Sequence, residues 1–221
     1  PLPIFSMNIG ARLSKYSAYK KILIDPRVAF KYNPISDLAI KISWGNFSQF
    51  LYTTNQEEEL LRIVDFWQPI PDGQKPQQSE HYILGAEYWI SSGNTISIET
   101  YYKKYLHLYD LNPLLDPSDV QNTIAVSGIG DAYGLELLYR LNINNISGWI
   151  GYAFSNIIRQ VDFNSDNEIW KDKEIYTAKY NKPHSFISVL NYKINEKYDF
   201  GISAVYESGQ TYTAVVGKVH Q

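Results

Sequence analysis

Apolar and polar side chains alternate along most of this chain with a period of two residues. The alternation is clearest at 38–45, 95–105, 133–141 and 198–207, and weaker at 7–15, 27–32, 81–90, 148–155 and 184–194. A period of two is typical of β-strands whose two faces meet different surroundings. The pattern therefore predicts an all-β chain of about nine strands, many longer than the roughly five or six residues of an ordinary strand.

The connections between these strands are expected to alternate between short and long. Short connections are predicted at 33–37, 91–94, 142–147 and 195–197, and long ones at 16–26, 46–80, 106–127 and 156–183. Barrels of the outer membrane have short periplasmic turns and longer external loops. The spacing thus favours an antiparallel transmembrane β-barrel, with about nine long strands of a larger barrel within residues 1–221 and long external loops near 46–80, 106–127 and 156–183.

The side chains opposite the apolar positions favour a wide, polar barrel lumen. An open sheet edge cannot lie in hydrocarbon, so these strands would have to close with others, and the Leu, Ile, Phe and Tyr faces would meet lipid. The many Tyr residues would then form girdles at the two interfaces. A soluble all-β ligand-binding or glycan-binding module, with its apolar faces packed on each other, remains the alternative, because alternation alone does not say which face is inside. The predicted lumen face carries Arg12, Lys31, Lys41, Glu87, Glu99, Lys103, Glu136, Arg140 and Glu207.

Composition removes several function classes. The chain has 221 residues, a net charge of −3 and no Cys, which gives no reason to expect nucleic acid as a partner and excludes disulfides and cysteine chemistry. It has no apolar run of the roughly 18 residues that a membrane helix needs. Residues 1–4 lack the features of a signal peptide, and residues 215–221 end without a closing element, so we expect a portion of a longer protein.

No metal, cofactor or catalytic residue is expected. The four His residues are dispersed, which argues against zinc. Residues 162–168 place oxygen ligands as a calcium loop does, but position twelve is Lys173 instead of Glu. His184 and Ser185 are adjacent on a predicted strand and would point to opposite faces, so they cannot act as a base and nucleophile pair. We therefore predict that the protein is not an enzyme.

Three stretches resemble the C-terminal barrel of TonB-dependent outer-membrane receptors, especially those of Bacteroidetes-like bacteria. The first joins Pro26–Tyr32 to Ile42–Gln49, and the second joins Ala132–Leu138 to Gly148–Ser155. The third joins Pro183–Phe186 and Asn191–Lys193 to Tyr206–Thr213. It departs from the family at Lys182, where Arg is common, and at Thr211, where Pro is common.

The resemblance covers residues 7–213 and implies a fragment of a 22-stranded receptor barrel. It implies a place in the outer membrane of a Gram-negative bacterium and active uptake of a scarce solute, such as a siderophore or a saccharide. The implied partners are outer-membrane lipid, a small or oligomeric solute, and TonB, reached through a plug domain that has no counterpart in this chain.

External loops and the upper lumen are where such a receptor would hold its ligand. Residues 56–67 form a helix-like patch inside the longest predicted loop, followed by a Pro-rich stretch. Our candidate ligand-binding residues, chosen by location and aromatic character, are Trp67, Tyr101, Tyr105 and Trp170.

Overall fold

The chain folds as antiparallel β-structure throughout the part that can be described. The computed structural model describes residues 3–17, 19–53, 67–70, 72–110, 126–161, 174–178 and 180–211. Within these ranges there is no helix of the length and hydropathy needed to cross a membrane. The all-β prediction is therefore confirmed.

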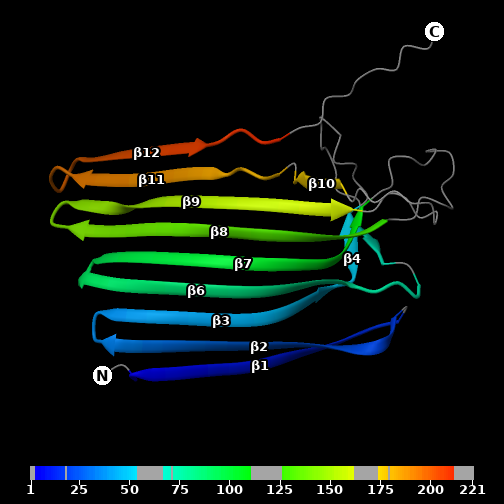
Figure 1. Ribbon diagram of the computed structural model, residues 1–221. Coiled ribbons are helices and arrows are strands. Elements are labelled where there is room, and N and C mark those ends of the chain that lie inside the picture. The colour runs from blue at the N-terminus through cyan, green and yellow to red at the C-terminus, as the bar shows by residue number, and fades with distance from the viewer. Residues whose placement is uncertain are drawn as a thin grey trace, which may run out of the picture.

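Nine long strands lie side by side in one broad sheet, in the order in which the chain forms them (Figure 1). A short strand, β10 (Glu174–Thr177), adds to β9, and two others, β4 (Leu51–Thr53) and β5 (Trp67–Pro69), form a separate pair. The nine strands of the main path are β1 (Phe5–Tyr16), β2 (Tyr19–Ile35), β3 (Leu38–Gln49), β6 (Gln77–Ser91), β7 (Asn94–Asp110), β8 (Val126–Ile143), β9 (Ile146–Val161), β11 (His184–Lys193) and β12 (Asp199–Glu207).

The four short connections are confirmed and lie together at one end of the sheet (Figure 1). They join β2 to β3, β6 to β7, β8 to β9 and β11 to β12. The β8–β9 turn contains Asn144, whose φ of 51° lies in the left-handed region that Asn tolerates better than most residues. These turns fix the register of the four hairpins.

At the opposite end the predicted connections were too long, and one was wrong. Tyr16 of β1 pairs directly with Tyr19 of β2, so no long loop exists at 16–26. Consecutive apolar residues Ile22, Leu23 and Ile24 break the period of two there and hide the strand. Strands extend well into the other three predicted long connections, since β3 reaches Gln49 and β7 reaches Asp110, and the central parts of these connections lie outside the described residues.

The two faces of the sheet have different chemistry, and single rows of paired residues show it. One row of direct cross-strand partners is apolar on every strand of the main path, and the adjacent row, one residue along, faces the other side. The apolar row is Phe5, Tyr32, Ile40, Ala86, Ile98, Leu137, Tyr152, Phe186 and Tyr206. The adjacent row is Ser6, Lys31, Lys41, Gly85, Glu99, Glu136, Ala153, Ser185 and Glu207.

The apolar face is exposed over much of its area. Ile42, Leu84, Ile98, Leu137 and Phe200 all belong to it and are among the exposed large hydrophobic residues. Such contiguous apolar surface marks a membrane or protein contact in most proteins. The sheet also remains open, because no pairing within the described ranges joins β1 to β12. Closure into a barrel is therefore not seen here.

Candidate functional site: the polar face of the sheet

The polar face gathers every charged residue that the sequence assigned to the lumen. Glu99 and Glu136 pair across β7 and β8, and Lys31 and Lys41 pair across β2 and β3. Like charges directly opposite each other are destabilising unless water or a counter-charge screens them. Lys41 has such a counter-charge, since its Nζ lies 2.6 Å from a carboxylate oxygen of Glu87. This arrangement needs a hydrated surface.

Both signs of charge occur on this face. In the row next to the apolar row, β2 and β3 carry Lys31 and Lys41, whereas β7, β8 and β12 carry Glu99, Glu136 and Glu207. In other rows the signs are mixed, with Glu87 on β6 and the cations Lys103 and Arg140 on β7 and β8.

Four cations of this face lie against aromatic rings, among them Arg159, which is 6.0 Å from the ring centre of Tyr176. The Arg27 guanidinium carbon lies 4.4 Å from the ring centre of Phe47, and Lys103 Nζ lies 4.5 Å from that of Tyr101. Lys31 Nζ is 5.8 Å from the Trp89 ring. A cation over a ring face is held in place electrostatically without a carboxylate having to compensate its charge.

Tyr101 and Tyr105, two of the predicted ligand-binding residues, point to this polar face from β7. Tyr101 lies flat over Gly134 of β8, its direct partner, and a Cβ built on that glycine would lie 2.6 Å from the Tyr101 hydroxyl oxygen. Tyr105 stands edge-on to His81 with ring centres 6.3 Å apart. The structure thus places both tyrosines on the polar face beside His81 and Lys103. We call these four residues the aromatic and basic strip.

A depression opens at the β1–β2–β3–β6 end of this strip. Its volume is about 400 Å³, and its polar-face lining includes Arg27, Gly45, Phe47 and His81. Phe47 and His81 pack together with ring centres 4.4 Å apart. The Nε2 atom of His81 is buried and has no hydrogen-bond partner within the described part of the chain. We call this feature the Arg27 depression.

The β4–β5 pair forms a small packed element at the end of the sheet that bears the long connections. Tyr52, Ile70 and Tyr109 form its buried cluster, and the Tyr109 hydroxyl donates to the backbone oxygen of Lys75 at 2.6 Å. Burial raises the pKa of both Tyr52 and Tyr109. Trp67 lies on β5 with 57% of its surface exposed. It belongs to a strand, and the rest of the predicted helix lies outside the described residues.

A row of four aromatic residues crosses the apolar face toward the end of the sheet that bears the long connections. Their polar side-chain atoms are hydrogen-bonded. Trp44, Tyr82, Tyr102 and Tyr133 are successive cross-strand partners on β3, β6, β7 and β8. Trp44 Nε1 and the Tyr82 hydroxyl both donate to Glu80, at 2.9 and 2.7 Å. The Tyr102 hydroxyl donates to Asp131 and Asn156 Nδ2 donates to the Tyr133 hydroxyl. Aromatic residues whose rings lie on an apolar surface and whose polar atoms are hydrogen-bonded suit a boundary between hydrocarbon and water.

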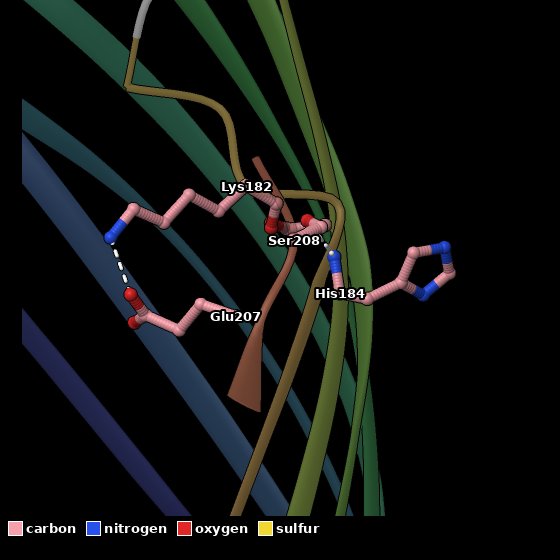
Figure 2. Close-up of polar contacts among 5 residues, drawn as sticks. Lys182, His184, Glu207 and Ser208 are labelled. Atoms are coloured by element: carbon pink, nitrogen blue, oxygen red, sulfur yellow. Dashed lines mark hydrogen bonds and ion pairs between the residues drawn. The ribbon is translucent and has the colours of Figure 1, made fainter. Parts of the chain in front are cut away.

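The start of β11 and the end of β12 meet through three contacts (Figure 2). Lys182 Nζ pairs with Glu207 at 2.5 Å, and the His184 amide donates to Ser208 Oγ at 3.0 Å. The Ser208 amide donates back to the His184 carbonyl at 2.8 Å. The His184 ring points away from the Lys182–Glu207 pair, to the apolar face, where Tyr152 contacts it. Because Ser185 pairs on the polar face, the prediction that His184 and Ser185 point apart is confirmed.

The register places Tyr101 and Tyr105 on the face opposite the apolar row, as the alternation predicted, whereas Trp67 lies on the separate β4–β5 pair. Their role in ligand binding stays a prediction. Trp170 and the calcium-like stretch 162–168 lie outside the described residues. Within the ranges that are described, no group of His, Asp and Glu is arranged to hold a metal ion. Arg27, Phe47 and His81 were missed, although Arg27 and Phe47 occur in the resembling stretches and His81 shares the polar-face parity of Glu87.

No protein-family model, curated protein or solved structure matches this chain.

Proposed function

We propose that this chain is part of the barrel of a TonB-dependent outer-membrane receptor, which takes up a scarce solute. The observation that supports it best is the pair of adjacent cross-strand rows, one apolar on all nine main strands and one mostly polar or charged. Strands of membrane barrels alternate in this way between lipid and lumen. The three resembling sequence stretches support the family assignment.

Three further features fit this proposal. Four tight turns lie together at one end of the sheet, as periplasmic turns would, and only the β1–β2 turn is short at the other end of the described sheet. The Trp44–Tyr133 aromatic row lies toward the other end, where an outer interface would be. The Lys182–Glu207 and His184–Ser208 contacts join the two halves of the third resembling stretch across β11 and β12.

The proposed mechanism begins with capture of the solute by external loops and the upper lumen. A plug domain outside residues 1–221 would then rearrange under force transmitted by TonB from the inner membrane. The polar face described above would line the path of the solute. Siderophores and saccharides are the solute classes proposed, and no catalytic step is involved.

Membrane placement is tested with single cysteines, since residues 1–221 contain none. A fluorophore is attached to Leu84→Cys on the apolar face or to Ser97→Cys on the polar face, in the intact protein reconstituted in vesicles. We expect acyl chains that carry bromine to quench the first fluorophore and to leave the second nearly unchanged. Equal quenching, or a protein that is monodisperse in plain buffer and absent from outer-membrane fractions, would favour the soluble binding module instead.

Uptake is tested separately, by deleting the gene in its own host. We expect the deletion strain to stop depleting one solute from the medium, and a strain that lacks TonB to show the same defect. Depletion that persists in both strains for every solute would contradict a role in transport.

A further inference from the structure

The Arg27 depression has the shape of a small binding site. Its floor is made of small residues that β1, β2 and β3 place on the polar face of the sheet, among them Gly10, Ala29, Ser43 and Gly45. Its walls are Arg27, Phe47 and His81. The volume of about 400 Å³ lies in the range of small-molecule sites.

The Arg27 guanidinium is held in place but lacks a carboxylate. It lies over Phe47 at 4.4 Å from the ring centre, and its side chain packs on Gly45, where a Cβ would lie 3.0 Å from Arg27 Cγ. Among the residues that the structure describes, it forms no ion pair. Asp25, two residues away on the same face of β2, is only 1% exposed; its Oδ1 accepts a hydrogen bond from Ser48 at 2.7 Å, and its Oδ2 has no hydrogen-bond partner among the described residues.

His81 adds a second polar group with unused capacity. Its Nε2 atom is buried without a partner in the described ranges, and burial of an unpaired polar atom is unfavourable unless something else satisfies it. Its cross-strand neighbour is Lys103, whose Nζ lies over Tyr101. Positive charge therefore borders the depression from β2 and from β7.

We propose that the Arg27 depression binds a flat organic anion, a ring system that bears a carboxylate. The guanidinium presents a planar set of N–H donors that matches a carboxylate in a two-point contact. The Phe47 and His81 rings and the glycine-rich floor accommodate the flat part of the solute. This inference deepens the proposed function, on which it rests in taking the polar face to be open to solute.

The test compares a carboxylate with its neutral isostere. Binding of 2-naphthoate and of 2-naphthamide to the intact protein is measured by ligand-observed NMR, in detergent or in plain buffer, whichever keeps the protein monodisperse. We expect the acid to bind at least about tenfold more tightly than the amide, since a charge-assisted pair exceeds a neutral hydrogen bond by that order.

Two variants and one control assign the effect to Arg27. Arg27→Gln is expected to remove the preference for the acid. Arg27→Lys, which keeps the charge but not the planar donors, should lose part of it and serves if the Gln variant does not fold. Arg140→Gln is the matched control, because Arg140 is a cation of the same face on β8, outside the depression.

Equal binding of acid and amide, no binding of either, or an equal loss in Arg140→Gln would overturn the proposal. Its failure is distinct from that of the receptor assignment. A protein found to be soluble could still bind the acid through Arg27, and a protein found in the outer membrane could fail to bind it.

Discussion

At the scale of single residues, the polar face depends on glycines that leave room for a large side chain on the next strand. Tyr101 covers Gly134 and Arg27 covers Gly45, in each case across a direct cross-strand pair. The large side chain then lies flat against the sheet. Tyr101 is for that reason more firmly packed than a free ligand-binding aromatic would be.

Substitution of Gly134 tests this packing. In Gly134→Ala the new methyl group would meet both the Tyr101 hydroxyl, at 2.6 Å, and the backbone oxygen of Phe154. Overpacking of this kind costs about 1–3 kcal/mol, so we expect a lower midpoint of thermal unfolding. Gly10→Ala is the matched control, because a Cβ at Gly10 has no atom within 4 Å and should leave the midpoint nearly unchanged. Equal midpoints for the two variants would contradict the packing of Tyr101 on Gly134.

A second residue, His107, makes the end of β7 sensitive to pH. The register of β7 and β8 shifts between Leu106 and Leu108, and His107 has a φ of 55° there. Burial lowers the pKa of His107, with a smaller contribution from the charge of Lys75. The folded state therefore binds a proton at His107 less readily than the unfolded state does. The contribution of the neutral ring to the free energy of unfolding is complete above pH 6.5, the ordinary pKa of His, and is lost as the pH falls below that value.

We expect faster amide hydrogen exchange around residues 106–108 as the pH is lowered from roughly 7.5 to 5.5, after correction for the intrinsic rate. His107→Asn should remove this dependence and keep the irregularity, because Asn tolerates positive φ. His107→Val should loosen the segment at every pH, because a β-branched residue is strained in that conformation. An unchanged pH dependence in His107→Asn would assign the effect to another group.

At the scale of elements, the β4–β5 pair is anchored by a few buried contacts of its own. Ile70 is only 2% exposed. Its amide donates to the carbonyl of Phe50 at 2.9 Å, and the Tyr16 hydroxyl lies 3.4 Å from the Ile70 carbonyl. Tyr52 and Tyr109 complete the cluster. The β4–β5 pair is thus packed on the sheet, and Trp67 on β5 is exposed.

Truncation of Ile70 should open this pair without unfolding the sheet. Ile70→Ala removes a buried side chain, which costs about 2–5 kcal/mol, and the loss should appear as faster hydrogen exchange at residues 51–53 and 67–70. The unfolding of the main sheet should shift little, because the pair contributes few contacts to it. Leu51→Ala, at an exposed position of β4, is the control and should exchange as the wild type does.

The strands and turns were predictable because their signals are local. All nine main strands arise where polar and apolar residues alternate, and the turns arise at Asn, Asp, Gly and Ser positions between them. The ends of the strands were not predictable. Beyond Gly45 and Tyr105 the side chains no longer alternate clearly, but the backbone stays paired with the neighbouring strands as far as Gln49 and Asp110. The Arg27 depression was missed for a similar reason: Arg27, Gly45 and His81 are far apart in sequence and meet only through the register.

At the scale of the whole molecule, the sequence predicted two faces, but the alternation alone could not say whether the apolar face is exposed or packed inside a sandwich. Register converts the alternation on each strand into two continuous surfaces, and the exposed Ile, Leu, Phe and Tyr residues then gather on one of them. A small buried core remains at Tyr52, Ile70 and Tyr109. Most of the apolar surface of the sheet is therefore available to a lipid or protein surrounding.

The directions of β1 and β12 lead to the last prediction. All eight pairings along the main path are antiparallel, so β1 and β12 run in the same direction. If they closed on each other, or on a second copy with the same orientation in the membrane, the seam would be parallel. An antiparallel barrel, as we propose, therefore needs an odd number of further strands between β12 and β1, and hydrocarbon does not tolerate bare edges.

Hydrogen exchange on the intact, membrane-embedded protein tests this closure. We expect the β1 and β12 amides that point away from β2 and β11 to be as protected as those inside the sheet, because a strand outside this path would pair with each of them. In the β11–β12 turn the amides of Asn195 and Lys197 donate hydrogen bonds, so the amide of the exposed Glu196 between them is the reference and should exchange fast. Rapid exchange at both edges would mean that the sheet stays open, which is incompatible with lipid on its apolar face and would instead favour a partner protein over that surface.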